Sequence, residues 1–228
     1  MADQRHLLRL DALSGVPHGF TTGLGDAGPP DAGPLVDGGT LVLCEQVHSA
    51  DVVVADKQFD VSARPKGDAL VTDRRGLVLS IVTADCVPVL LADPAAGVVG
   101  AVHAGWRGAK AGIIERAVDA MCDLGAQRAR VVAGIGPCIH QASYEVDEAF
   151  RAAFGQEYAQ FFAPGREGHW QFDLPGYVDA RLASAGVQVS EHADLDTYAH
   201  PGLLHSYRRA MHQGRDTTGR QYSLIAVP

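Results

Sequence analysis

The sequence has few cysteines, few aromatic residues and a deficit of positive charge. Its four cysteines, Cys44, Cys86, Cys122 and Cys138, are too sparse for a disulfide-stapled scaffold, so thiols are the default state. Nineteen basic residues stand against 27 acidic ones, giving a net charge of −8. That balance argues against a general nucleic-acid binder and against a protein that binds anionic membranes.

Long apolar runs are also absent. The first ten residues lack the apolar core and cleavage pattern of a signal peptide, and no stretch of about 18 apolar residues occurs. We therefore expect a cytoplasmic protein that has no membrane partner. A length of 228 residues, 46% of them hydrophobic, suits one domain spanning residues 1–228. The sequence does not determine the oligomeric state, and a monomer is the default expectation.

Apolar, β-branched segments predict strands that gather in the middle of the chain. Residues 21–39, rich in Gly, Pro and Asp, are typical of a surface loop. Pro88 places its strand at a sheet edge or near the strand's start, and a turn at residues 93–97 makes 87–103 a hairpin. Strands that cluster favour an α+β fold with mixed sheets over a doubly wound parallel fold. Strands are predicted at 41–47, 52–54, 77–82, 87–92, 98–103, 130–135, 187–190 and 223–227, and helices at 109–124, 148–154 and 177–185.

Two histidines and a cysteine occupy the ends of predicted strands. His48 follows one strand, Cys86 lies at the turn between two, and His103 ends a third. Because Cys86 and His103 flank the predicted hairpin, we expect them to be neighbours. Two imidazoles and a thiolate suit Zn²⁺, with a fourth position left for water. Spacing alone is a weak signal, since no CxxC or HExxH pattern is present and a buried cysteine is often a small hydrophobe.

The segments around these residues resemble the laccase-domain family, whose members are also called YfiH-like or purine nucleoside phosphorylase/adenosine deaminase-like proteins. The resemblance runs from about residue 17 to the C-terminus. It implies a layered α/β/β/α sandwich with mixed sheets and a metal held by His48, Cys86 and His103. The matching segments are Gln46-Val-His48, Gly67-Asp-Ala-Leu-Val-Thr-Asp73, Thr83-Ala-Asp-Cys86, Val102-His-Ala-Gly-Trp-Arg-Gly108, Gly134-Ile-Gly-Pro-Cys138, Tyr144-Glu-Val146, Ser206-Tyr-Arg-Arg209 and Thr218-Gly-Arg220.

The sequence departs from the family pattern in its N-terminal part and near residue 196. Gly19-Phe20 is followed by Thr21-Thr22-Gly23, where the family usually has an arginine near the start of a longer Gly-rich segment. The region before Gln46 is also shortened by roughly a helix. Asp196-Thr197 stands where a Cys-Thr pair is usual. These departures affect the expected substrate and leave the metal triplet intact.

The first function that the resemblance implies is a zinc-dependent purine nucleoside enzyme. It would catalyse phosphorolysis of adenosine or inosine and deamination of adenosine, using metal-activated water for the deamination. Its partners would then be small molecules, a purine nucleoside and phosphate. Asp85 and Glu145 are candidate proton shuttles, and the catalytic set is Cys86, His103 and Asp85. Candidates for substrate or phosphate binding are Arg107 at a predicted helix start, Gln46 and Arg208, with Arg209 and Arg220 as further donors.

Three other functions remain open. In a hydrolase that edits a peptidoglycan precursor, such as a UDP-muramyl peptide, Cys86 would be the nucleophile and His103 its base. A polyphenol oxidase (laccase) would use Cu²⁺, which the triplet can accept. However, a multicopper oxidase needs His-x-His pairs, and none of the 10 histidines forms one. The third possibility is a partner protein that holds a metal without catalysis.

Other conspicuous residues have simpler interpretations. Trp106 could stack on a base, but a tryptophan after a turn is more often part of the core. Cys138 is expected to be structural, and Cys44 and Cys122 fit the core pattern of a strand and a helix. The spacing of His200, His205 and His212 is too loose to indicate a second metal site.

Overall fold

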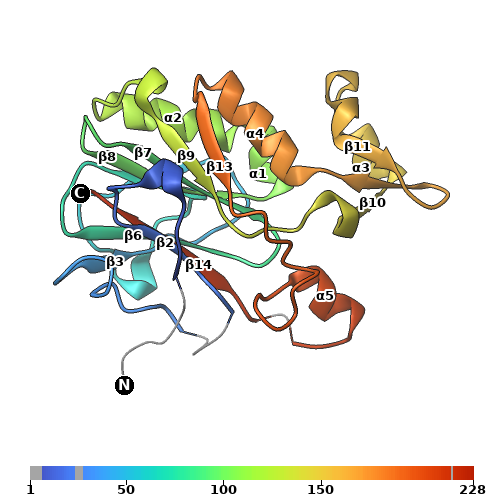
Figure 1. The fold of residues 1–228 in the computed structure, drawn as a ribbon, viewed down its shortest axis with the longest axis horizontal. Coiled ribbons are helices and arrows are strands. Elements are labelled where there is room, and N and C mark those ends of the chain that lie inside the picture. Colours follow the sequence, from blue (N-terminus) through green and yellow to red (C-terminus); the bar gives the residue numbers. More distant parts are fainter. Residues whose placement is uncertain (1–6, 24–27, 217) are drawn as a thin grey trace.

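Two β-sheets stacked face to face form the body of the molecule (Figure 1), a computed structural model that describes residues 7–23, 28–216 and 218–228. The strands of these sheets are β1 (Leu7–Leu8), β2 (His18–Thr21), β3 (Thr40–Val42), β4 (Val52–Val54), β5 (Ala69–Thr72), β6 (Leu77–Thr83), β7 (Val87–Asp93), β8 (Val98–Ala104), β9 (Val132–Ile135), β13 (Val189–His192) and β14 (Gln221–Ala226). One sheet has the order β1-β2-β14-β6-β3, and the other β13-β9-β7-β8-β5-β4. Pairs β3–β6, β4–β5 and β9–β13 are parallel and the rest antiparallel, which confirms the predicted mixed sheets.

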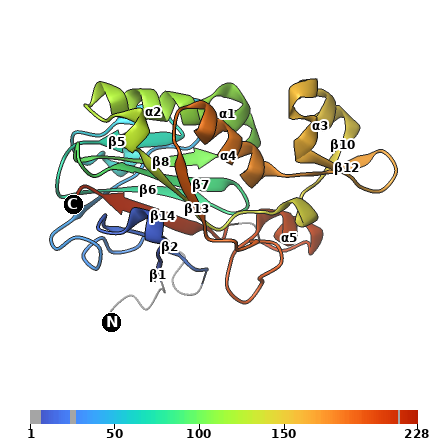
Figure 2. The same ribbon diagram turned by 45° about the horizontal axis from the view of Figure 1, so that its top comes forward.

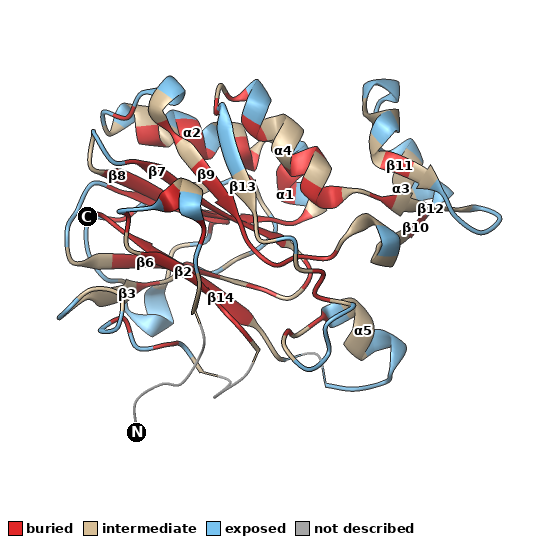
Figure 3. Cartoon of the chain, viewed as in Figure 1, coloured by how far each residue is buried: buried red, intermediate tan, exposed pale blue. Residues whose placement is uncertain are grey.

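The apolar runs of β7 and β8 are explained by burial on both faces. Leu90 of β7 points into the core between the two sheets, whereas its neighbours Val89 and Leu91 face the helical layer. Both strands are buried along their whole length, as the red colouring in Figure 3 shows. Because successive side chains of a strand point to opposite faces, a strand between two apolar layers has no polar alternation. The predicted hairpin is confirmed, with Pro88 the second residue of central strand β7, paired with His103.

Three helices cover the outer face of the six-stranded sheet (Figure 2): α1 (Trp106–Ala111), α2 (Ile113–Asp123) and α4 (Leu174–Ser184). The α2 helix buries Ile113, Ile114, Ala117, Val118 and Met121, the spacing that the sequence indicated. The single helix predicted over 109–124 is wrong in one respect. The chain breaks at Gly112, whose φ of 92° ends α1 and begins α2 at a new angle.

An aromatic lobe extends beyond the end of the two sheets. It contains β10 (Glu145–Asp147), α3 (Glu148–Ala152), β11 (Phe162–Pro164) and β12 (His169–Phe172), and the three strands pair in the order β10-β12-β11. Phe154 and Phe172 pack with centroids 5.1 Å apart, and both contact Tyr177 of α4. The lobe thereby attaches to the helical layer, and it places Tyr144 near the ends of β6 and β8.

The remaining elements are short. Helix α5 (Tyr207–His212) lies near the start of β14, and 3₁₀ helices lie at Asp11–Leu13, Val61–Ala63, Arg128–Arg130, Gln141–Ser143 and Gln156–Phe161. Residues 24–27 of the predicted loop 21–39 lie outside the described residues, while its Ala32, Leu35 and Val36 pack on the outer face of the five-stranded sheet. The predicted strand 41–47 is shorter than expected, because β3 ends at Val42 and only Glu45 pairs beyond it. No helix in the described part of the chain is long and apolar enough to cross a membrane.

Candidate metal centre and its cavity

The fold brings His48, Cys86 and His103 together at one end of the sheets. His48 lies in the segment between β3 and β4, Cys86 ends the turn between β6 and β7, and His103 is the penultimate residue of β8. One ligand atom from each lies within 4.8 Å of the others, and His48 Nε2 is 3.9 Å from Cys86 Sγ. The two imidazole rings meet edge to face with centroids 4.8 Å apart. Within the described ranges this is the one such group of His, Cys, Asp or Glu residues.

Asp68 supports this group through hydrogen bonds, a role that the sequence pattern did not indicate. Its carboxylate is fully buried and accepts a 2.7 Å hydrogen bond from His103 Nδ1. It also accepts bonds from the backbone N–H groups of Val47, His48 and Ser49 and from the Ser49 hydroxyl. These bonds fix His48 at a φ of 60°, a left-handed conformation that non-glycine residues rarely adopt. One signal was available: an acidic residue directly before an apolar strand must find partners if it is buried.

The electrostatics of the site favour charged side chains in the metal-free protein. Burial raises the pKa of Cys86, but the neighbouring His103 and His48 outweigh it and bring the pKa down to about 6. Burial lowers the pKa of His103, but Cys86 and Asp68 outweigh it and raise the pKa to about 9. Asp68 itself has a pKa of about 2, because bonds from His103 and Ser49 overcome its burial. Both shifts favour a thiolate at Cys86 and an imidazolium at His103 in the metal-free site.

Two glycines of the His-Ala-Gly-Trp-Arg-Gly segment make room for the cluster. A Cβ on Gly105 would stand 2.9 Å from His48 Cδ2 and 3.1 Å from Cys86 Sγ. A Cβ on Gly108 would stand 2.7 Å from the Ser49 carbonyl oxygen. Both contacts are too short for a side chain, so these glycines let α1 pack directly against the segment that carries His48.

The donor set fits zinc. Tetrahedral zinc with bonds of about 2.0–2.3 Å separates its ligand atoms by roughly 3.5 Å, so a closure of roughly 1 Å brings the three donors to ligating distance. His48 is exposed and free to make that movement. His103 donates its Nδ1 proton to Asp68, which leaves Nε2 as the ligand atom and fixes the tautomer, as second partners of metal-bound histidines do. Three protein ligands leave a position for water or substrate.

A cavity of about 560 Å³ opens at the cluster, within the usual range of roughly 300–1,000 Å³ for small-molecule sites. Apolar and aromatic side chains form part of its wall, among them Ile139, Tyr144 and Leu174. The predicted binding residues Gln46, Arg107, Arg208 and Arg220 all line it, together with Asp85.

The polar lining residues differ in how they are held. The Gln46 amide bonds both backbone groups of Val82, at 2.8 Å each, and is therefore rigid. The Arg208 guanidinium donates to the Glu145 carbonyl oxygen at 2.7 Å and lies over the Tyr144 ring. Arg107 lies over Trp106, in the first turn of the six-residue helix α1.

Hydrogen bonds connect the Asp85 carboxylate to Thr197 and to the start of α5. Its backbone adopts a φ of 88°, and its buried carboxylate accepts bonds of 2.6 Å from both the Thr197 hydroxyl and the Arg208 backbone N–H. The residue next to Cys86 therefore anchors the start of α5, which carries Arg208. The unusual Asp196-Thr197 pair contacts Asp85 through Thr197, whereas the Asp196 carboxylate accepts bonds from Ser143 and Tyr198.

Several predicted candidates lie away from the cluster. The Glu145 carboxylate forms an ion pair with Arg166 on the surface, and its side chain does not line the cavity. Arg209 donates to the carbonyls of Thr197, Tyr198 and Leu204, so it braces a loop. The core interpretation fits three further residues: Trp106 packs on Phe150, and Cys44 and Cys138 are buried. All four cysteines are free thiols.

Comparison with known proteins identifies the family. The family described as "Multi-copper polyphenol oxidoreductase laccase" matches residues 35–228. This chain belongs to that laccase-domain family. Although the family name refers to several coppers, the described part of this chain offers one three-ligand group, too few ligands for a multinuclear copper cluster.

Relatives within the laccase-domain family carry enzyme names. A purine nucleoside phosphorylase of Streptomyces griseus is 43% identical over 79% of this chain and 73% of its own length. One from Deinococcus radiodurans is 37% identical over 97% and 93% of the two chains. An adenosine deaminase from an unknown prokaryotic organism is 35% identical over 81% and 76%. The crystal structure of the YfiH protein of Bacillus licheniformis superposes with a TM-score of 0.85 at 28% identity, covering 99% of this chain and 98% of that one. The chain is an enzyme of this family, with the YfiH-like fold.

Proposed function

We propose that this chain is a zinc-dependent purine nucleoside enzyme that catalyses phosphorolysis of adenosine and inosine and deamination of adenosine. The observation that carries the proposal is the His48–Cys86–His103 group, braced by Asp68, in the wall of a cavity that also holds Arg107 and Arg208. Relatives named purine nucleoside phosphorylase and adenosine deaminase support the substrate class.

Different residues of the cavity suit the two substrates of phosphorolysis, the nucleoside and phosphate. The apolar wall of Ile139, Tyr144 and Leu174 suits a purine base, which has large apolar faces. Arg107 and Arg208 offer fork-shaped donors for phosphate. Zinc, when bound, supplies a Lewis acid that activates water near neutral pH. Asp68 contributes by orienting His103, and Asp85 by holding Arg208 at the cavity wall.

Product analysis with and without phosphate tests this proposal. Phosphorolysis converts adenosine and phosphate to adenine and ribose 1-phosphate, and deamination converts adenosine and water to inosine and ammonia. We expect the zinc-loaded enzyme to form adenine only when phosphate is present and inosine in either case. Removing zinc, verified by elemental analysis, should abolish both reactions, and adding zinc back should restore them. Full purine turnover by zinc-free enzyme would refute the metal role.

A second candidate function is favoured by the charge state of the site. A thiolate at Cys86 beside protonated His103, itself held by Asp68, has the arrangement of a cysteine hydrolase triad. Cys86 would attack an amide carbonyl and His103 would protonate the leaving amine, for instance on a UDP-muramyl peptide that bears a wrong amino acid. Water would then hydrolyse the resulting thioester, releasing the acid and the free Cys86 thiolate. Chelation separates the two functions, because only the hydrolase should keep its activity. A Cys86→Ser variant does not separate them, since it damages both.

A further inference from the structure

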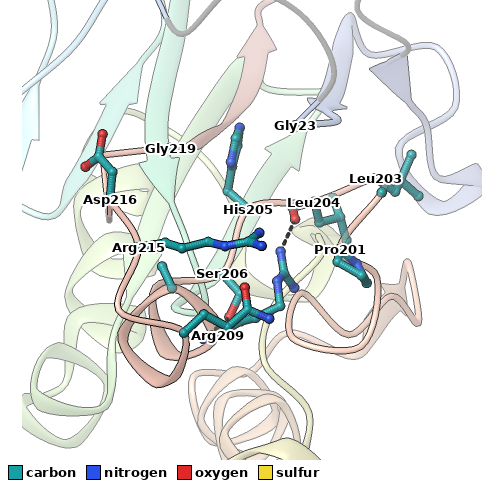
Figure 4. Close-up of a pocket in the computed structure, with 13 residues that line it drawn as sticks. Gly23, Pro201, Leu203, Leu204, His205, Ser206, Arg209, Arg215, Asp216 and Gly219 are labelled. Carbon is teal, nitrogen blue, oxygen red and sulfur yellow. Dashed lines mark hydrogen bonds between the residues drawn. The ribbon is translucent and has the colours of Figure 1, made fainter.

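The structure has a second, smaller cavity of about 200 Å³ (Figure 4). Helix α5 forms part of both walls: Arg208 lines the metal cavity, whereas Arg209 lines the smaller one. Arg215, His205 and Ser206 also line the smaller cavity, which we call the basic cavity. The chain as a whole carries a net charge of −8, so the two arginines of this cavity form a positive site on a protein that is negative overall.

Two guanidinium groups point toward each other in the basic cavity, as Figure 4 shows. Arg209 is held in place by bonds to three backbone carbonyls, those of Thr197, Tyr198 and Leu204. The Arg215 side chain extends toward it from the segment after α5, and its guanidinium makes no hydrogen bond or ion pair with any residue that the structure describes. Two like charges that face each other repel, and an anion between them would remove that repulsion.

The acidic side chain of the cavity lining does not supply a negative charge between the two guanidinium groups. Asp216 is the single acidic residue among those lining the basic cavity in the described part of the chain. Its carboxylate oxygens accept bonds from the Thr218 backbone N–H and hydroxyl, at 3.0 and 2.8 Å. Figure 4 shows it turned away from the two guanidinium groups.

His205 completes the wall as a rigid neutral group. A Cβ on Gly219 would stand 2.2 Å from its Nδ1 and one on Gly23 2.9 Å from its Cδ2, so backbone packs closely on the imidazole. Burial lowers the pKa of His205, and the charges of Arg209 and Arg220 lower it further. The lowered pKa is the expected response to a positive local potential.

We propose that the basic cavity binds a small oxyanion of the phosphate class between the guanidinium groups of Arg209 and Arg215. A tetrahedral oxyanion accepts fork-shaped bonds from both groups at once, and charge-assisted bonds of this kind are the strongest available to it. The ion is either free inorganic phosphate or the phosphate group of a small ester. This site is separate from the phosphate position proposed in the metal cavity, and it does not depend on zinc or on nucleoside chemistry.

Calorimetric titration with inorganic phosphate, without nucleoside, tests the proposal. The metal cavity is proposed to take phosphate too, so the titration uses an Arg107→Gln background. In that background, adding Arg215→Gln should weaken phosphate binding at least tenfold, because one charged fork is lost. Adding Arg75→Gln, an exposed change in the turn before β6, should leave it unchanged. Unchanged binding in the Arg215→Gln protein would overturn the proposal.

A crystal of the wild-type protein soaked in selenate gives a second measurement that requires no variant. Selenate has the size and shape of phosphate, and its anomalous signal locates it directly. We expect a peak between Arg209 and Arg215, and a peak confined to the metal cavity would overturn the proposal. Repeating the titration with ribose 5-phosphate identifies the source: tighter binding than inorganic phosphate supports a phosphate ester, and weaker binding supports the free ion. Turnover is not a readout, so failure of the proposed purine activity would leave these outcomes unaffected.

Discussion

The Asp68 carboxylate lies 2.7 Å from His103 Nδ1, and the same oxygen accepts a 2.9 Å bond from the His48 backbone N–H. One buried side chain therefore sets the ring of one candidate ligand and the backbone of another. The carboxylate stabilises the left-handed conformation of His48, because it also accepts bonds from the backbone N–H groups of Val47 and Ser49 on either side.

An Asp68→Asn substitution should weaken zinc binding by roughly 10–100-fold, the usual cost of losing the carboxylate that accepts the second N–H of a metal-bound histidine. The asparagine keeps the size of the side chain but turns an amide N–H₂ toward donors that need an acceptor. Competition with a chromophoric chelator measures the zinc affinity. Asp56→Asn, an exposed change in the same part of the chain, should leave it unaltered. An unchanged zinc affinity in Asp68→Asn would show that the carboxylate does not support the site.

Gly105→Ala should also impair zinc binding, with little effect on the fold. Gly105 has a φ of −68°, which alanine adopts without strain, so the effect comes from space alone. The new Cβ would press on His48 and Cys86 at 2.9 and 3.1 Å. We expect at least a tenfold weaker zinc affinity and a nearly unchanged unfolding temperature. Gly202→Ala, where no atom lies within 4 Å of the new Cβ, is the matched control.

Removing zinc should expose a reactive thiolate at Cys86. Its pKa is lowered to about 6 from 9.0, so the thiolate predominates above pH 6 in the metal-free protein. The rate of alkylation by iodoacetamide at Cys86, followed by peptide mass spectrometry, should rise through about pH 6 and then level off. Cys44 is an internal control, because burial raises its pKa to about 12. Saturating zinc should suppress the reaction, and a midpoint near pH 9 would contradict the predicted thiolate.

Asp93 at the turn of the central hairpin should contribute to stability. Its buried carboxylate binds Arg130 at 2.8 Å and accepts bonds from the backbone N–H groups of Gln127 and Ala96. Burial raises its pKa, but these partners outweigh it and hold the pKa below the ordinary 3.8. We expect Asp93→Asn to lower the free energy of unfolding at pH 7 by about 1–3 kcal/mol.

The pH dependence of this loss of stability follows from the direction in which the pKa of Asp93 is shifted in the folded protein. A carboxyl whose pKa is lower in the folded than in the unfolded state stabilises the fold above its unfolded pKa. That contribution disappears as the pH falls through the lower, folded pKa. The difference between wild type and Asp93→Asn in urea unfolding should therefore be constant from pH 7 to about 5 and shrink below about pH 4. Asp73→Asn, on the surface, should change stability by less than about 0.5 kcal/mol. A constant difference down to pH 2 would refute the linkage.

The sequence predicts the central strands well, because burial on both faces produces long apolar runs such as those of β6, β7 and β8. It misses the four-residue strands β5 and β2, which are buried at every position and therefore show no polar alternation. It also misses the lobe of β10, β11 and β12, where aromatic packing rather than apolar alternation fixes the strands. The break at Gly112 is hidden because the apolar spacing of α2 continues across it.

The sequence likewise indicates some residues of the candidate site and misses others. His48, Cys86 and His103 could be named because their residue types suggest metal chemistry and the surrounding segments resemble a family. Asp68 could not, since its role arises from burial and from five donor groups that converge on it from other parts of the chain. Arg209 was named for its charge, and the structure shows three carbonyls around it that no sequence pattern indicates.

The role of Asp85 can be decided by comparing two substitutions. If Asp85 positions the start of α5, its bonds to Thr197 and to the Arg208 backbone matter, and the carboxyl need not carry a proton. Thr197→Val removes one of these bonds and leaves the carboxylate in place. We expect Thr197→Val to raise the KM for phosphate roughly three- to tenfold, corresponding to one lost hydrogen bond, with kcat nearly unchanged. Asp85→Asn should raise the same KM further and leave the shape of the pH–kcat profile intact. A proton shuttle predicts the reverse: Thr197→Val is silent, while Asp85→Asn lowers kcat and removes one limb of the profile.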